Sequence, residues 1–325
     1  MNSGQSRSIL STISILSFFL AIFPVRILAR SPQNPRSSKS DLRSQAEHGD
    51  ASAQYRLASS ILADHPSASD LQEALKWLRA AAAKNNPDAE FVLGYLYEHG
   101  QGVSQDYAFA FRNYRDAAAQ HHPGAENNLA SLYQNGLGVP KDAHNAFEWY
   151  SASAQHGDPI AQCNLAALYF TGSGTPRDIP QAVQWLRAAS DSGLPEARLH
   201  LAYFYFYGIA LPRDYDHAAQ LVRFAARAGL PAAETSMGFL FEQGKGVPLD
   251  YVSAYTWYSR AITAGDQSSI DRRKQLAKIM TAKQMNEADA LLDVSAGHPP
   301  LPASTLASSE AFSLLSQGVV PPRTP

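Results

Sequence analysis

Cysteine is almost absent from this sequence, since Cys163 is the single thiol in 325 residues. One thiol cannot form a disulfide within the chain, so the fold has to be held together by side-chain packing. This scarcity excludes the small, disulfide-stapled architectures.

A surplus of charge is missing as well. The chain has 27 basic and 29 acidic residues, which gives a formal net charge of −2. Proteins that bind nucleic acid usually concentrate basic residues on one face. The balance of charge therefore predicts that nucleic acid is not a partner.

Common catalytic motifs are also lacking. The sequence contains no HExxH, GxSxG or GxxxxGK(S/T) pattern. We therefore predict no catalytic residue, no cofactor and no metal site. Gly172-Ser173-Gly174 is interpreted as an inter-helix turn, because glycines with serine are typical turn residues. Cys163 has no histidine at a catalytic spacing in the sequence, and we predict a semi-buried structural thiol.

The histidines receive ordinary structural interpretations. His121 and His122 fall in a turn between repeats, where adjacent histidines are usually solvated. His99 and His156 fall at helix ends, where an imidazole interacts favourably with the helix dipole.

The two ends of the chain differ from its middle. Arg7 precedes a mostly apolar run over residues 9–25, which predicts a signal peptide over residues 1–29. An uncleaved membrane anchor is the alternative, which would hold the protein near a membrane or cell wall. Either reading predicts an extracytoplasmic protein, periplasmic or secreted. Polar and proline-bearing residues predict a flexible linker over 30–44, and a proline- and serine-rich composition predicts a disordered tail over 295–325.

The middle of the chain repeats itself every 36 residues. Three kinds of residue recur in one register, and chance does not produce several such columns. The columns are Ala53, Ala89, Ala125, Ala161, Ala197 and Ala233; Gly100, Gly136, Gly172, Gly208 and Gly244; and Asp106, Asp142, Asp178, Asp214 and Asp250.

Each column predicts one element of a helical hairpin. Apolar residues at three- and four-residue steps predict a first helix, which Gly136 ends in the third unit. Asp142 is expected to cap the second helix. Tryptophans recur on the second helix and are expected in the core, together with an aromatic column on the first helix. The tryptophans are Trp77, Trp149, Trp185 and Trp257, and the first-helix aromatics are Tyr97, Tyr133, Tyr169, Tyr205 and Phe241.

The period divides the chain into six units. We place them at 51–86, 87–122, 123–158, 159–194, 195–230 and 231–266, within a repeat region of 45–266. Two further helices over 267–294 are expected to cap the array, and Thr281 with Gln284 fits a capping box. Because one unit cannot bury its own apolar face, the units must stack on each other.

Three segments carry a resemblance to a known family. Residues 93–119 (LGYLYEHGQGVSQDYAFAFRNYRDAAA), 129–157 and 237–265 share an apolar helix, a GxGVxxD turn, an alanine and an aromatic pair. In these features the chain resembles the Sel-one-like repeat (SLR) family, which is related to the tetratricopeptide repeats. The resemblance implies an all-α fold, a right-handed α–α superhelix of antiparallel helix pairs. It also implies a non-catalytic adaptor that assembles other proteins.

Positions that vary between the units are candidates for binding a partner. In solenoids of helix pairs the first helices line the concave face, where a protein or peptide could lie. The candidate residues, which combine amides with aromatic rings, are Tyr95, Asn128, Ser131, Asn164, His200, Tyr203 and Phe239.

Two alternatives remain at this point. Some cysteine-rich secreted relatives are proposed to act as β-lactamases or to bind penicillin, but their repeats carry cysteine pairs that this chain lacks. The other alternative is an envelope scaffold whose exposed aromatic residues, such as Tyr203, bind glycans of the cell wall.

Overall fold

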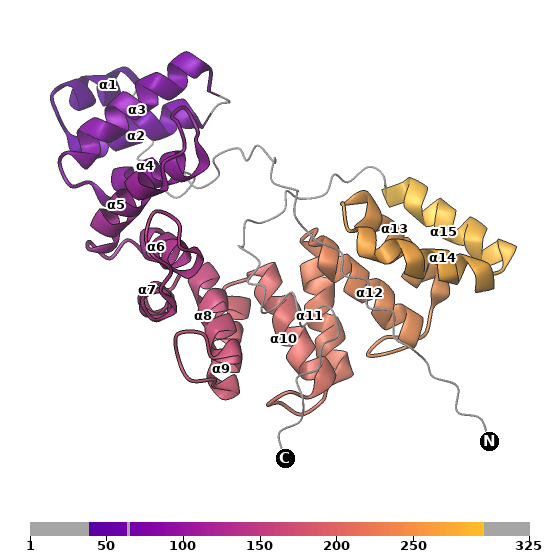
Figure 1. The fold of residues 1–325 in the computed structure, drawn as a ribbon. Coiled ribbons are helices and arrows are strands. Elements are labelled where there is room, and N and C mark those ends of the chain that lie inside the picture. The colour runs from indigo at the N-terminus through magenta and orange to yellow at the C-terminus, as the bar shows by residue number, and fades with distance from the viewer. Residues whose placement is uncertain (1–38, 64–65, 296–325) are drawn as a thin grey trace.

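The computed structural model describes residues 39–63 and 66–295, and these residues form helices without any strand. Six antiparallel pairs follow one another along a curved path (Figure 1). The all-α fold of repeated helix pairs predicted from the sequence is therefore confirmed. The pairs are α2 (Ala51–Leu62) with α3 (Ala68–Ala82), α4 (Pro87–His99) with α5 (Tyr107–Ala118), α6 (Pro123–Asn135) with α7 (Ala143–Gln155), α8 (Pro159–Thr171) with α9 (Ile179–Asp191), α10 (Pro195–Tyr207) with α11 (Tyr215–Arg227), and α12 (Pro231–Gln243) with α13 (Tyr251–Thr263).

Additional helices cover both ends of the array. Helix α1 (Lys39–Glu47) packs against α2 and brings Ala46 into the core. At the other end, a short 3₁₀ turn (Gln267–Ser269) leads into α14 (Ile270–Ile279) and α15 (Ala282–Ser295), and both helices pack against α13. The Thr281 and Gln284 side chains bond to each other's backbone N–H groups at 3.3 and 2.9 Å, which is the capping box that the sequence predicts.

Helix α1 corrects one boundary of the sequence interpretation. The linker expected over 30–44 is helical from Lys39 onward, because the end of the first repeat needs a cover for its apolar face. The predicted signal peptide or anchor (1–29) and the predicted tail over 295–325 lie outside the described residues, except for Ser295, which ends α15. Among the helices of the described part, none is both long and apolar enough to cross a membrane.

The glycine and aspartate columns set the ends of the helices. The first helices of units two to six each end at a glycine with a left-handed backbone, at φ between 60° and 76°. Left-handed backbone is costly for residues with a Cβ, so glycine is the residue that ends a helix in this way most easily. The second helices begin after an aspartate whose carboxylate accepts a bond from the backbone two or three residues on. The capping aspartates are Asp106, Asp142, Asp178, Asp214 and Asp250.

The first unit departs from this rule. Its second helix, α3, begins at Ala68, and Ser67 rather than Asp70 is the capping residue. Asp70 instead completes a capping box, because its carboxylate accepts from the backbone N–H of Ser67 at 2.9 Å. The helix is therefore longer at its start than its counterparts.

The centre of the core lies one residue after the tryptophan column. Trp149, Trp185 and Trp257 are partly buried and pack at the edge of the core, and the aromatic column of the first helices is partly buried too. The fully enclosed positions of the second helices are Leu78, Tyr114, Tyr150, Leu186 and Tyr258, with Val222 nearly so. The tryptophan column therefore belongs to the core, with Trp77 buried and the other three at the edge, about 100° around the helix from the core centre.

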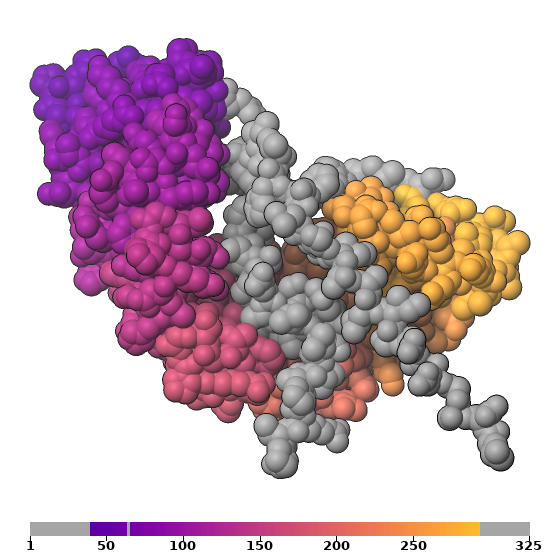
Figure 2. Space-filling model, in the orientation of Figure 1, coloured from indigo at the N-terminus to yellow at the C-terminus, as the bar shows by residue number. Residues whose placement is uncertain are grey.

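Neighbouring units approach closely at the second glycine of the turn in the third, fourth and sixth units. A Cβ added to Gly138 would lie 2.3 Å from the backbone oxygen of Tyr107, which belongs to the preceding unit. The same addition at Gly174 or Gly246 would bring the Cβ within 2.0 Å of a preceding unit's backbone oxygen. The space-filling view shows successive units from α1 to α9 packed in continuous contact (Figure 2).

Candidate functional site: an aromatic groove between the fifth and sixth units

A groove of about 250 Å³ lies where α10, α11, α12 and α14 meet. The face formed by the first helices of the units supplies most of its lining. The lining residues are Leu199, Ala202, Tyr203, Phe206, Tyr207, Ala218, Val222, Thr235, Ser236, Phe239, Leu240 and Arg272.

Aromatic rings dominate this lining and brace each other. Phe206 packs against Phe239 at 5.9 Å and against Tyr207 at 4.9 Å, measured between ring centroids. The rings of Tyr203 and Tyr207 lie 4.6 Å apart. Tilted and edge-on pairs at these distances attract each other, so the rings hold one another in place.

One cation stands at the edge of the groove. The Arg272 guanidinium lies 5.0 Å over the Phe239 ring and pairs with the Glu242 carboxylate at 3.2 Å. Its charge is therefore partly offset by Glu242, while the guanidinium also interacts with the Phe239 ring. The groove can accept an apolar side chain and offers hydroxyl groups for hydrogen bonds.

The aromatic lining is related to a pair of residues, one on each helix of a unit, that differs between units. In three units the enclosed second-helix residue is tyrosine, and its hydroxyl donates to a polar partner on the first helix. The bonds are Tyr114 to Glu98 at 2.6 Å, Tyr150 to Gln134 at 3.0 Å and Tyr258 to Glu242 at 2.6 Å. Burial raises the pKa of Glu98, the first of these partners.

The fourth and fifth units replace this polar pair with an apolar pair. Leu186 and Val222 take the place of tyrosine, and Phe170 and Phe206 take the place of the hydrogen-bonding partner. Phe206 has no tyrosine hydroxyl to accept from, and its side chain lines the groove. Part of the variation between units on the first helices is thus explained by packing inside the units.

The seven predicted partner-binding residues are not brought together into one site. Tyr203 and Phe239 line the groove. Tyr95 stacks on His99 at 4.1 Å, and Ser131 accepts through its backbone oxygen from the Asn135 amide at 2.9 Å. Tyr95 lies in the second unit and Ser131 in the third, whereas the groove lies between the fifth and sixth units.

The candidate asparagines, Asn128 and Asn164, form hydrogen bonds within the fold. The buried Asn164 amide donates to the Asn127 side chain at 3.1 Å, and the Asn127 amide donates to Asn128 at 3.0 Å. This network joins α6 to α8, so these amides stabilise the stacking of first helices. Sequence reasoning missed Tyr207 and Arg272 as lining residues of the groove. Phe206 is a varying first-helix position, and the replacement of the core tyrosine in the fifth unit is the signal that marks it.

The structure corrects the interpretation of Cys163 in one respect. Although no histidine is near it in the sequence at a catalytic spacing, the His200 Nδ1 lies 3.5 Å from its sulfur in the next unit. Burial raises the pKa of the Cys163 thiol to about 12 and lowers the pKa of His200 to about 4. Both groups are neutral near pH 7, whereas a nucleophilic cysteine needs a thiolate. The pair is therefore a packing contact between α8 and α10.

The fold and groove define a helical-repeat solenoid, and the comparison with known families identifies its kind. The sequence model of the Sel1 repeat matches six consecutive segments, 51–86, 87–122, 123–158, 159–194, 195–230 and 231–266. The chain belongs to the Sel1 repeat family. Helical solenoids of this family typically mediate contacts between proteins and are generally non-catalytic.

Solved structures share the fold. A protective antigen of uropathogenic Escherichia coli strains with an SLR fold is 30% identical, with a TM-score of 0.69, over 78% of this chain and 54% of the antigen. This chain thus spans about half the length of that antigen. A Sel1 repeat protein from Oxalobacter formigenes is 24% identical, with a TM-score of 0.65, over 78% of this chain and 99% of its own length. No curated protein matches the sequence.

Proposed function

We propose that this protein is a non-catalytic scaffold that binds a partner protein through the aromatic groove on the concave, first-helix face of the solenoid. The observation that carries the proposal is the groove itself, with four aromatic side chains gathered between two adjacent units. Aromatic residues and arginine supply most of the binding energy at protein interfaces. A segment of a partner that carries an apolar side chain would fill the groove.

A non-catalytic role is supported by the chemistry of the described residues. The one cysteine–histidine contact is held neutral by burial, and Arg272, the cation at the groove, is already paired with Glu242. The groove residues offer rings and hydroxyl groups but no activated nucleophile.

The groove can be tested by crosslinking from two positions. A photo-reactive amino acid would replace Tyr207, which lines the groove, or Gln184, which is exposed on α9. We expect a partner to be captured from position 207 and not from position 184. Equal capture from both positions would show that the groove is not the contact surface.

The repeats supply a matched variant for the affinity of that partner. Tyr203 and Phe239 share a column with Ser131, so the Tyr203→Ser and Phe239→Ser changes introduce a residue that the fold already accepts there. The double variant should weaken binding by about 2 kcal/mol or more, roughly 30-fold. Ser131→Ala is the control and should bind as the unaltered protein does. Unchanged affinity of the double variant, with the helical signal intact, would contradict the proposal.

We also propose that the scaffold works outside the cytoplasm. The apolar run over residues 9–25 after Arg7 supports export or anchoring. Cell fractionation and amino-terminal sequencing of the mature protein test this part. Recovery from the cytoplasm with Met1 in place would refute it.

A further inference from the structure

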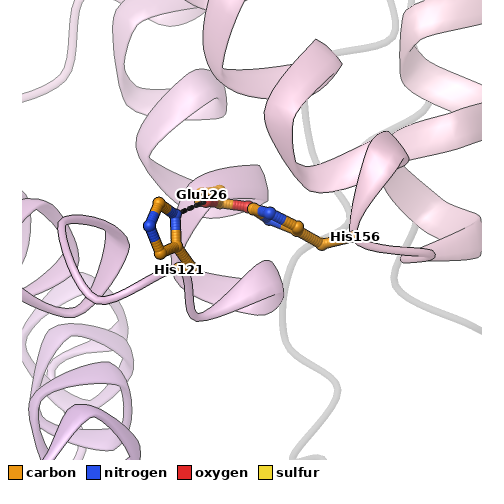
Figure 3. A group of neighbouring side chains, drawn as sticks. All are labelled: His121, Glu126 and His156. Atoms are coloured by element: carbon orange, nitrogen blue, oxygen red, sulfur yellow. Dashed lines mark hydrogen bonds and ion pairs between the residues drawn. The ribbon is translucent and has the colours of Figure 1, made fainter.

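Two imidazoles and a buried carboxylate meet at the edge of the third unit. His121 lies in the connection between α5 and α6, Glu126 lies in the first turn of α6, and His156 ends α7. Figure 3 shows the two rings on either side of the Glu126 carboxylate. The Nδ1 of His156 lies 2.7 Å from one carboxylate oxygen, and the Nδ1 of His121 lies 3.9 Å from the other.

These distances suit a shared metal ion. The three ligand atoms lie within 4.8 Å of one another. Zinc binds histidine nitrogen and carboxylate oxygen at about 2.0–2.2 Å, so ligand atoms around a tetrahedral ion lie roughly 3.4 Å apart. The 2.7 Å separation joins His156 to Oε2 of Glu126, and the 3.9 Å separation joins His121 to Oε1. Binding one ion therefore requires the imidazoles to move until both nitrogens and one carboxylate oxygen surround it.

The ligand atoms are also accessible from one side. The Glu126 side chain is 1% exposed, while the His121 side chain is 79% exposed and the His156 side chain is 39% exposed. An ion can therefore arrive from solvent between the rings and reach a carboxylate that the fold holds in place. Water would supply the fourth ligand.

The same repeat position has other partners elsewhere in the array. Glu90, one unit earlier, accepts from the Gln120 amide at 2.9 Å, and Gln120 occupies the position of His156. Glu234 pairs with Arg260 at 3.0 Å. Among these glutamates, Glu126 has partners that can both bind a metal.

His121 has a left-handed backbone, as does Asn85 at the same position of the preceding unit. His121 has φ of 61°, and the equivalent positions in later units are Gly157, Gly193, Gly229 and Gly265, all with positive φ. A left-handed backbone is strained for a residue with a Cβ. The second unit thus bears a backbone strain at His121 that glycine would remove, and the imidazole of this residue lies beside Glu126 of the third unit.

His122 has a separate task and does not belong to the set. Its Nδ1 accepts from the backbone N–H of Ala125 at 3.1 Å, and its ring stacks on Phe91 at 4.6 Å. The ligand set is therefore two nitrogens and one carboxylate. Calcium and magnesium prefer oxygen ligands, whereas zinc accepts this mixture.

We propose that His121, Glu126 and His156 form a zinc site that fastens the turn between α5 and α6 to the end of α7. Each neutral imidazole would bind through Nδ1 and carry its proton on Nε2, which faces away from the ion. The site is separate from the aromatic groove and does not depend on the proposed function.

The test uses the purified full-length chain without a polyhistidine tag. After treatment with a chelator, the protein is titrated with zinc chloride by calorimetry and with cobalt(II), whose visible absorption reports tetrahedral coordination. We expect one ion per chain and a higher Tm in zinc, since an ion that binds only the folded state stabilises it. Absence of saturable one-to-one binding would overturn the proposal.

Matched variants distinguish zinc binding at this site from zinc binding by other histidines of the chain. His121→Gly introduces the residue of the later units, and His156→Gln reproduces the Glu90–Gln120 pair. Each should weaken zinc binding more than tenfold, while the metal-free fold keeps its Tm or, for His121→Gly, gains. His48→Gln is the control, because His48 shares the repeat position of His156 but bonds to the backbone of Ser44. Unchanged zinc affinity in either ligand variant would overturn the three-ligand site.

Discussion

Replacing Gly138 by alanine should disrupt the contact between the second and third units. Gly138 has φ of 69°, and an added Cβ would lie 2.3 Å from the Tyr107 oxygen and 2.4 Å from its carbonyl carbon. Carbon atoms do not approach a backbone oxygen so closely, so one of the two units has to move. The variant therefore combines backbone strain with a clash between units.

The magnitude follows from these two terms. A left-handed backbone costs alanine about 1–2 kcal/mol, and the stiffer unfolded chain returns about 0.4–1 kcal/mol, which leaves a net cost of about 1 kcal/mol. Overpacking adds about 1–3 kcal/mol. We expect Gly138→Ala to lower the free energy of unfolding by about 2–4 kcal/mol in total.

Gly157→Ala isolates the first term. Gly157 has φ of 87° and nothing within 4 Å of an added Cβ, so this variant bears the strain without the clash. Urea unfolding followed by far-UV circular dichroism measures both variants at an unchanged m value. If Gly138→Ala costs no more than Gly157→Ala, the reasoning about close contact between units is wrong.

Three further predictions rest on single residues. Ala210 has φ of 52° where other units have the second glycine, so Ala210→Gly should raise the free energy of unfolding by about 0.5–1 kcal/mol in the same urea assay, and a loss would contradict this. Hydrogen bonds from the backbone and side chain of Asn145 hold the pKa of Asp142 below its ordinary 3.8. The contribution of Asp142 to the free energy of unfolding is therefore present above that pH and disappears as the pH falls through the lower, folded pKa. Asp142→Asn should flatten this part of the stability profile in acid titrations, and an unaltered profile would count against the cap. Because burial raises the pKa of Cys163 to about 12, a thiol reagent at pH 8 should react with it slowly in the folded protein and quickly in urea, and fast reaction without urea would show that the thiol is accessible.

The sequence by itself determined the architecture. Helix ends depend on local chemistry, so Gly136 and Asp142 mark them wherever the pattern recurs. A fixed period of 36 residues then requires that identical hairpins stack. The helix α1 was missed because residues 39–47 carry no repeat signature, and its place follows from the apolar end that it covers.

Tertiary structure alone decided which side chains meet between units. Cys163 and His200 are 37 positions apart, and His121 and His156 are 35 apart, so no local pattern connects either pair. The angle at which one hairpin packs on the next sets these contacts, and that angle depends on the sum of many packing interactions. The same angle brings Phe206 of one unit against Phe239 of the next and so creates the groove.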